Sequence, residues 1–163
     1  MAPSIPFQEP PYLNNLSSPY YNDSHRKWQK TCRQFVTEVL NKVEPGWDET
    51  ADGPGMLYKK FGEAGFLLAK LPGPLPVKWL KAHGIHELAG GLKVEEYDQF
   101  HFLIFIDEMT LGGTTGPGGS ITDGFSYGVP PLFNYGSKEL QERFIPDLIA
   151  GRKITCIAIT EPG

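Results

Sequence analysis

The sequence is poor in cysteine, in excess basic charge and in long hydrophobic runs. Only two cysteines occur in 163 residues, which does not indicate a disulfide framework. Cys32 and Cys156 are expected to be small buried side chains. There are 15 Lys and Arg against 19 Asp and Glu, for a net charge of -4, unlike the basic footprint of a nucleic-acid-binding domain. No apolar run approaches the roughly 20 residues that a membrane-spanning helix needs.

Residues 1–22 are predicted to form an irregular leader. Five prolines in this stretch oppose a helix. The stretch has no basic segment followed by an apolar core, so it does not resemble a secretory signal, and it lacks the arginines of a mitochondrial presequence. We therefore expect an intracellular protein, while the sequence assigns no compartment.

Residues 23–151 are predicted to form one mainly α-helical domain. Apolar residues recur at spacings of three and four from Trp28 to Val43, which predicts a helix capped by Asp23 or Ser24. A shorter helix is expected near 57–64, and the strongest over 94–111, because its sequence is apolar nearly all round. Further helices are expected over 120–134 and 137–150, after a flexible link at 112–119.

The last twelve residues, 152–163, carry a different pattern. The run Ile154 to Thr160 is rich in β-branched residues and is predicted to be a strand that opens a second, β-sheet domain. An apolar strand needs a neighbour for its backbone donors and acceptors. The chain is therefore expected to be the front portion of a larger protein.

Three other constellations favour ordinary structural roles. His83 and His86 lack the further ligands that a zinc site needs, and a surface loop is favoured. The glycine-rich stretch 116–119 follows a helix and has no Gly-Lys-Ser/Thr after it, so a linker is favoured over a phosphate loop. Asp107 and Glu108 point in different directions on one helix, and a buried pairing with an arginine of a neighbouring helix is favoured over acid–base chemistry. No metal site and no catalytic residue is assigned.

Several stretches in combination resemble the acyl-CoA dehydrogenase family. They are Phe105-Ile106-Asp107-Glu108-Met109, Tyr135-Gly136-Ser137-Lys138-Glu139-Leu140-Gln141, Phe144-Ile145-Pro146-Asp147-Leu148-Ile149-Ala150-Gly151 and Ile157-Ala158-Ile159-Thr160-Glu161-Pro162-Gly163. Trp79-Leu80-Lys81 and Gly90-Gly91-Leu92-Lys93 are similar to fungal members. The resemblance implies that 23–151 is the family's N-terminal helical-bundle domain and that 152–163 begins its middle β-domain.

The resemblance also implies a function. Members of the family use FAD to introduce an α,β double bond into an acyl-CoA thioester, and they are usually homo-oligomers. By position, Ile157, Ile159 and Thr160 would contact the flavin, with the Thr160 hydroxyl as a donor to the ring. The acyl-chain wall would come from the helix over 120–134; its candidates, unranked, are Phe125, Tyr127, Leu132 and Phe133.

The family's catalytic glutamate lies in its C-terminal bundle, so neither Glu108 nor Glu161 is assigned as the base. We expect the 163 residues by themselves to be inactive. Two alternatives stay open. One is a non-catalytic short chain that acts by associating with a full-length relative. The other is a flavin oxidase of the same fold that acts on a nitroalkane-type carbon acid.

Overall fold

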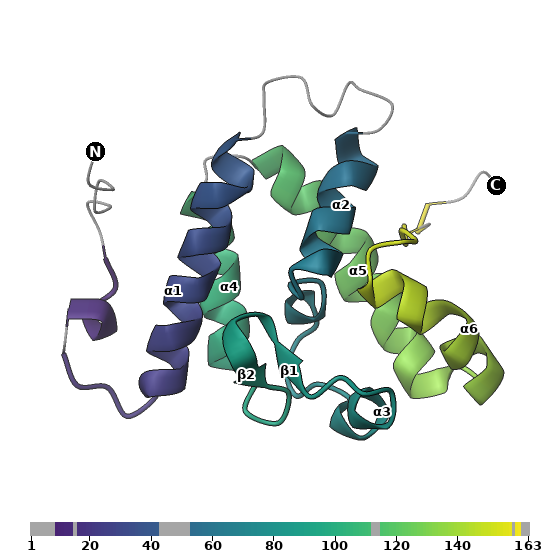
Figure 1. Cartoon of the computed structure of the whole chain (residues 1–163), viewed down its shortest axis with the longest axis horizontal. Coiled ribbons are helices and arrows are strands. Elements are labelled where there is room, and N and C mark those ends of the chain that lie inside the picture. The colour runs from purple at the N-terminus through teal and green to yellow at the C-terminus, as the bar shows by residue number, and fades with distance from the viewer. Residues whose placement is uncertain (1–8, 15, 43–52, 112–114, 158, 161–163) are drawn as a thin grey trace.

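The computed structural model describes residues 9–14, 16–42, 53–111, 115–157 and 159–160, and the side chains of 54 and 115–123 are not described. The described chain is mainly helical, as predicted, and Figure 1 shows the helices arranged around a common interior. The α-helices are α1 (Asp23–Glu38), α2 (Gly53–Glu63), α3 (Val77–Ala82), α4 (Gln99–Leu111), α5 (Thr115–Tyr135) and α6 (Lys138–Ile149). Short 3-10 helices are η1 (Pro11–Asn14), η2 (Leu40–Lys42), η4 (Leu68–Lys70) and η5 (Ala89–Gly91).

Helices α1 and α4 lie side by side and form the most extensive helix pair of the fold (Figure 1). The Nε1–H of Trp28, on α1, donates to the carbonyl of His101, on α4, over 2.9 Å. Aromatic rings pack against this helix pair. The centroid of the Phe35 ring lies 4.8 Å from that of Phe61 and 4.4 Å from that of Phe66. Fully burying each large apolar side chain contributes about 1.5–3 kcal/mol, so this aromatic layer is the main support of the domain.

The N-cap of α1 and the first residue of α4 differ from the predicted ones. The cap of α1 is Asn22, whose side chain accepts from the backbone N–H of Ser24 and His25. Helix α4 begins at Gln99 rather than near Val94, because the Asp98 carboxylate accepts from two backbone N–H groups of its first turn. An Asn or Asp at this position satisfies donors that have no intrahelical partner, and so fixes where a helix begins.

Helices α2, α5 and α6 form the other side of the domain (Figure 1). A methyl group on Gly62 of α2 would lie 2.6 Å from the backbone nitrogen of Gly151, so the end of α6 contacts the backbone of α2 directly. Gly151 itself has φ +71°, a left-handed conformation that favours glycine. These two glycines fix the turn from which the C-terminal residues depart.

Other predicted boundaries were also wrong. Helix α5 begins at Thr115 and not at Ser120, so the predicted link at 112–119 is helical from 115, and 112–114 lie outside the described residues. Pro117 does not prevent this start, because a proline in the first turn removes no intrahelical hydrogen bond. Strands β1 (Glu87–Leu88) and β2 (Leu92–Lys93) pair antiparallel, with Leu88 opposite Leu92.

The prediction of a strand over 154–160 also differs from the structure. The described residues of this stretch belong to no helix or strand. A strand exists only when a second strand accepts and donates its backbone hydrogen bonds, and the two-stranded β1–β2 sheet of the described residues does not include this stretch. The β-branched composition therefore did not suffice to make a strand.

Candidate functional site

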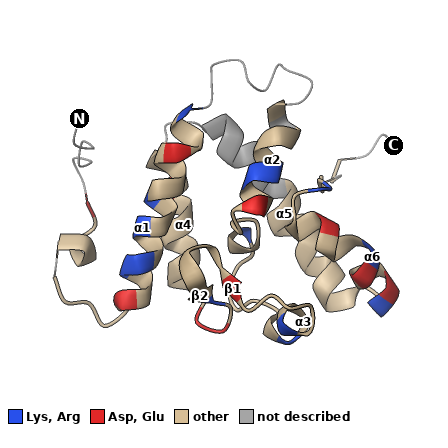
Figure 2. Cartoon of the chain, viewed as in Figure 1, with Lys and Arg blue, Asp and Glu red and all other residues tan. Residues whose placement is uncertain are grey.

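The stretch 152–160, here called the C-terminal segment, is anchored to α6 by ion pairs between its basic residues and an acidic residue of the helix (Figure 2). The Arg152 guanidinium lies 2.7 Å from Oδ1 of Asp147, and Lys153 Nζ lies 2.8 Å from its Oδ2. The hydrogen bonds from Lys153 and Arg152 lower the pKa of the Asp147 carboxyl. The segment is thus held to α6 for its first two residues.

Thr155 then crosses α5 at close range. A methyl group on Gly124 would lie 2.7 Å from the carbonyl carbon of Thr155 and 3.3 Å from Cα of Cys156. The Thr155 hydroxyl and the Tyr58 hydroxyl of α2 are neighbours, although neither makes a hydrogen bond of good geometry with a described group. Burial raises the pKa of Tyr58 to about 12, even though the Thr155 hydroxyl lowers it in part.

The three predicted flavin-contact residues follow this crossing and are open to solvent. Ile159 is 84% exposed, Ile157 is 38% exposed and Thr160 is exposed. Exposed isoleucine side chains cost free energy in water, and two of them beside the hydroxyl of Thr160 suit a planar ring with a polar edge. The composition and exposure of these residues therefore fit FAD, and their contact with it remains a prediction. Cys156, expected to be buried, is instead exposed.

The four candidates for an acyl-chain wall on α5 face different surroundings. Phe125 is fully buried, with its ring centroid 6.5 Å from that of Tyr58. Leu132 and Phe133 are partly buried against the core. Tyr127 is 67% exposed. Phe125 is thus part of the core, and Tyr127 is the most exposed of the four candidates.

The predicted pairing of Glu108 with an arginine is confirmed. Its carboxylate accepts from Arg33 Nε at 2.8 Å and Nη2 at 2.7 Å, and from Gln29 Nε2 at 2.7 Å. Glu108 is 1% exposed, so its oxygens have no access to a substrate. This bidentate geometry is structural, and a role in proton transfer has no support.

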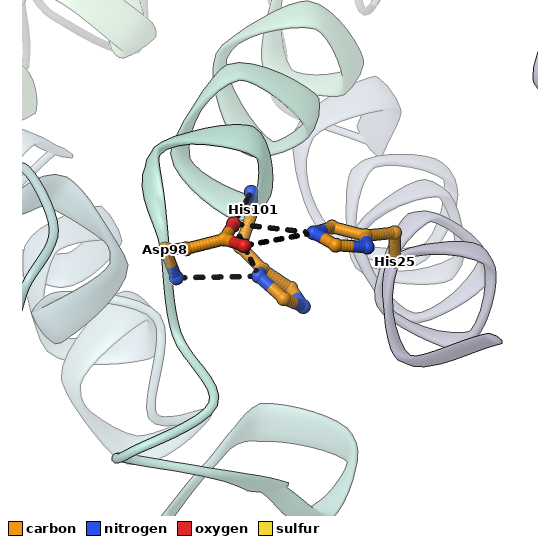
Figure 3. Close-up of side chains that lie close together, drawn as sticks. All are labelled: His25, Asp98 and His101. Atoms are coloured by element: carbon orange, nitrogen blue, oxygen red, sulfur yellow. Dashed lines mark hydrogen bonds and ion pairs between the residues drawn. The ribbon is translucent and has the colours of Figure 1, made fainter. Parts of the chain in front are cut away.

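A cluster that sequence reasoning missed lies where α1 and α4 begin. His25, Asp98 and His101 each offer a ligand-type atom within 4.8 Å of the others, and Figure 3 shows both rings directed at the one carboxylate. His25 Nε2 lies 3.1 Å from Asp98 Oδ1, and His101 Nδ1 lies 2.8 Å from the same oxygen. The two imidazoles stack with centroids 4.0 Å apart. A signal was present, because Asn22-x-x-His25 and Asp98-x-x-His101 both have capping-box spacing.

The hydrogen bonds of this cluster favour a double helix cap over a metal centre. Asn22 donates its backbone N–H to His25 Nδ1 over 3.0 Å, so the proton of the neutral ring is on Nε2, which donates to Asp98. Coordination of a metal at Nε2 would move that proton to Nδ1, against the N–H of Asn22. The cluster therefore joins the two helices through shared caps.

A further hollow of about 370 Å³ lies between α2, α3 and α6. Its lining is mainly apolar, including Leu68, Trp79 and Ile149, with His83, Glu87 and Arg152 as its polar groups. The His83 ring stacks on Trp79 at 3.7 Å between centroids. His83 thus lies in an exposed turn directly after α3, in agreement with the predicted surface loop.

Sequence comparison identifies the family. The model of the acyl-CoA dehydrogenase N-terminal domain matches residues 22–152. The chain belongs to the acyl-CoA dehydrogenase family. An acyl-CoA dehydrogenase of Emericella nidulans is 54% identical over 159 residues, which is 98% of this chain and 36% of that relative.

More distant relatives agree with this assignment. An acyl-CoA dehydrogenase of Alternaria alternata is 30% identical over 98% of this chain and 36% of its own length. The mitochondrial long-chain specific acyl-CoA dehydrogenase of Rattus norvegicus is 28% identical over 88% of this chain and 29% of its own length. The chain thus spans about a third of the length of these relatives. No solved structure matches the chain significantly.

Proposed function

We propose that this chain is the N-terminal helical portion of an FAD-dependent oxidoreductase that introduces an α,β double bond into an acyl-CoA thioester. The observation that supports it most is the 54% identity, over nearly the whole chain, to a fungal acyl-CoA dehydrogenase. The mainly helical structure agrees with the N-terminal domain of that family. Residues 152–163 are proposed to lead into the family's β-domain.

Within this enzyme the C-terminal segment would form one wall of the flavin site. Bound FAD supplies the acceptor for the hydride that leaves the β carbon while a carboxylate removes the α proton. Ile157 and Ile159 would pack on the ring, and the Thr160 hydroxyl would donate to its reactive edge, where charge develops during the reaction. Removing the Thr160 donor would therefore slow flavin reduction more than it weakens flavin binding.

We infer that the 163 residues alone do not catalyse the reaction. Ile157, Ile159 and Thr160 form a single exposed strip, whereas cofactor sites surround most of their ligand. Membership of the family implies that the catalytic base comes from the C-terminal bundle, and Glu108 is not proposed for that role because Arg33 and Gln29 hold its carboxylate. Assembly into a homo-oligomer is proposed only for the complete enzyme.

The test compares the purified chain with a chimera that joins residues 1–163 to the remainder of the Emericella nidulans relative. We expect the chain alone to purify without flavin absorbance. The chimera is expected to bind FAD and to reduce it when an acyl-CoA is added. A chimera that folds but binds no FAD would contradict the proposal, and stoichiometric FAD on the chain alone would contradict its predicted inactivity.

A further inference from the structure

Gly124 is the point of α5 at which two backbones meet. The peptide group of Thr155 lies where a side chain of residue 124 would begin, so a methyl group on Gly124 would overlap the Thr155 carbonyl. One turn further, a methyl group on Gly128 would make only an ordinary contact, 3.4 Å from Cβ of Thr155. The missing side chain at position 124, rather than a general run of small residues, therefore admits the C-terminal segment.

Two other helices contact the same C-terminal segment. Helix α6 holds Arg152 and Lys153 through Asp147. Helix α2 places the Tyr58 hydroxyl beside the Thr155 hydroxyl. Three helices thus contact the segment up to Thr155. Among the described residues of the segment, Thr155 is the one that is partly buried, and Ile154 and Cys156 on either side of it are exposed.

We propose that Gly124 is a positioning residue: its lack of a side chain sets the path of the C-terminal segment and thereby the placement of Thr160 against the flavin. This inference rests on the proposed function. Thr160 is five residues beyond Thr155, at most about 17 Å of extended chain. A backbone shift at Thr155 would therefore displace Thr160, and a displacement of about 1 Å can lower a reaction rate by as much as 100-fold.

The first experiment needs no cofactor and uses the 163-residue chain. Gly124→Ala should leave the helical circular dichroism unchanged, because alanine favours a helix, while trypsin should cleave after Arg152 and Lys153 at least three times faster. Gly55→Ala is the matched control, since no atom of the described residues lies within 4 Å of the added methyl group. Thr155→Gly tests the same segment without altering α5, and it should also accelerate this cleavage.

The second experiment places Gly124→Ala and Gly55→Ala in the chimera. Gly124→Ala should weaken FAD binding at least tenfold and shift the visible absorption band of the FAD that remains bound, whereas Gly55→Ala should change neither. A change in the flavin spectrum is expected only if the substitution alters the surroundings of the ring, so a general loss of stability would not produce it.

The outcomes separate this inference from the proposed function. If the unmodified chimera binds FAD and Gly124→Ala leaves affinity, spectrum and tryptic rate unchanged, the role of Gly124 is refuted and the proposed function stands. If the unmodified chimera folds and binds no FAD, the proposed function fails. In that case an unchanged tryptic rate in Gly124→Ala would also refute the path-setting role.

Discussion

Arg33 of α1 and Glu108 of α4 form a bidentate ion pair across the interface between the two helices. Nε and Nη2 of Arg33 lie 2.8 and 2.7 Å from the two oxygens of Glu108. A third group, the carboxylate of Glu9, contacts the same guanidinium. Burial opposes the charge on Arg33, but the hydrogen bonds with Glu108 and Glu9 outweigh it and raise the pKa of the guanidinium. Removal of Arg33 would leave the charge of the Glu108 carboxylate buried.

Arg33→Met should therefore lower the free energy of unfolding by roughly 3 kcal/mol, because it leaves the Glu108 carboxylate buried with only Gln29 as a partner. Urea unfolding followed by circular dichroism measures this change. Arg26→Met is the control, since Arg26 pairs with the fully exposed Asp23 and exposed pairs contribute little. Equal effects of the two substitutions would show that the buried pair has no special role.

Acid should destabilise the domain through His101. Burial, and then the stacked ring of His25, lower the pKa of His101 below its ordinary value, although Asp98 opposes this shift. The folded state then binds its proton less readily than the unfolded state, so stability is complete above the unfolded pKa of about 6.5 and decreases as the pH falls below it.

The neighbouring carboxylate adds a second loss at lower pH. Burial alone would raise the pKa of Asp98, but hydrogen bonds from His101 and His25 outweigh it and lower the pKa. Its contribution is present above the unfolded value and disappears as the pH falls through the folded one. Urea midpoints at pH 7.5 and 5.5 should differ for the wild type and differ less for His101→Gln, which keeps a capping-box residue. A pH-independent midpoint in the wild type would refute the His101 argument.

The two cysteines should react very differently with a thiol reagent. Cys156 is exposed, whereas Cys32 is fully buried. Burial, followed by the charge of Glu108, raises the pKa of the Cys32 thiol well above its ordinary value, which leaves little thiolate to react. One thiol per chain should react in the native protein, and two in 6 M urea. Rapid reaction of both native thiols would contradict the burial of α1 against α4.

Gly62 should be intolerant of a side chain. A methyl group there meets the backbone at Ala150 and Gly151, so Gly62→Ala should lower the free energy of unfolding by roughly 1–3 kcal/mol. Gly55 lies on the same helix, and no described residue approaches the position of an added methyl group. Gly55→Ala should therefore leave stability unchanged or raise it by up to about 1 kcal/mol. The measurement is the same urea titration. A harmless Gly62→Ala would mean that α2 and α6 are not in backbone contact.

Part of the candidate site was predictable because its signal is local. The pairing of Glu108 with an arginine followed from the presence of a carboxylate on an apolar helix. The same reasoning placed the first cap at Asp23 or Ser24, whereas Asn22 has that role. Three adjacent polar residues offer equivalent caps in sequence, and the choice among them depends on where His25 meets Asp98.

The sequence by itself determined that the five longest α-helices form and to which family the chain belongs, since helical periodicity, turn residues and motif order are properties of neighbouring residues. Only the tertiary structure decided that His25 reaches the carboxylate of Asp98, that Gly62 and Gly124 admit other backbones, and that the described residues of the stretch 154–160 form no strand. These features join residues from 31 to 89 positions apart or depend on a pairing partner, and no local pattern encodes which distant backbone will approach.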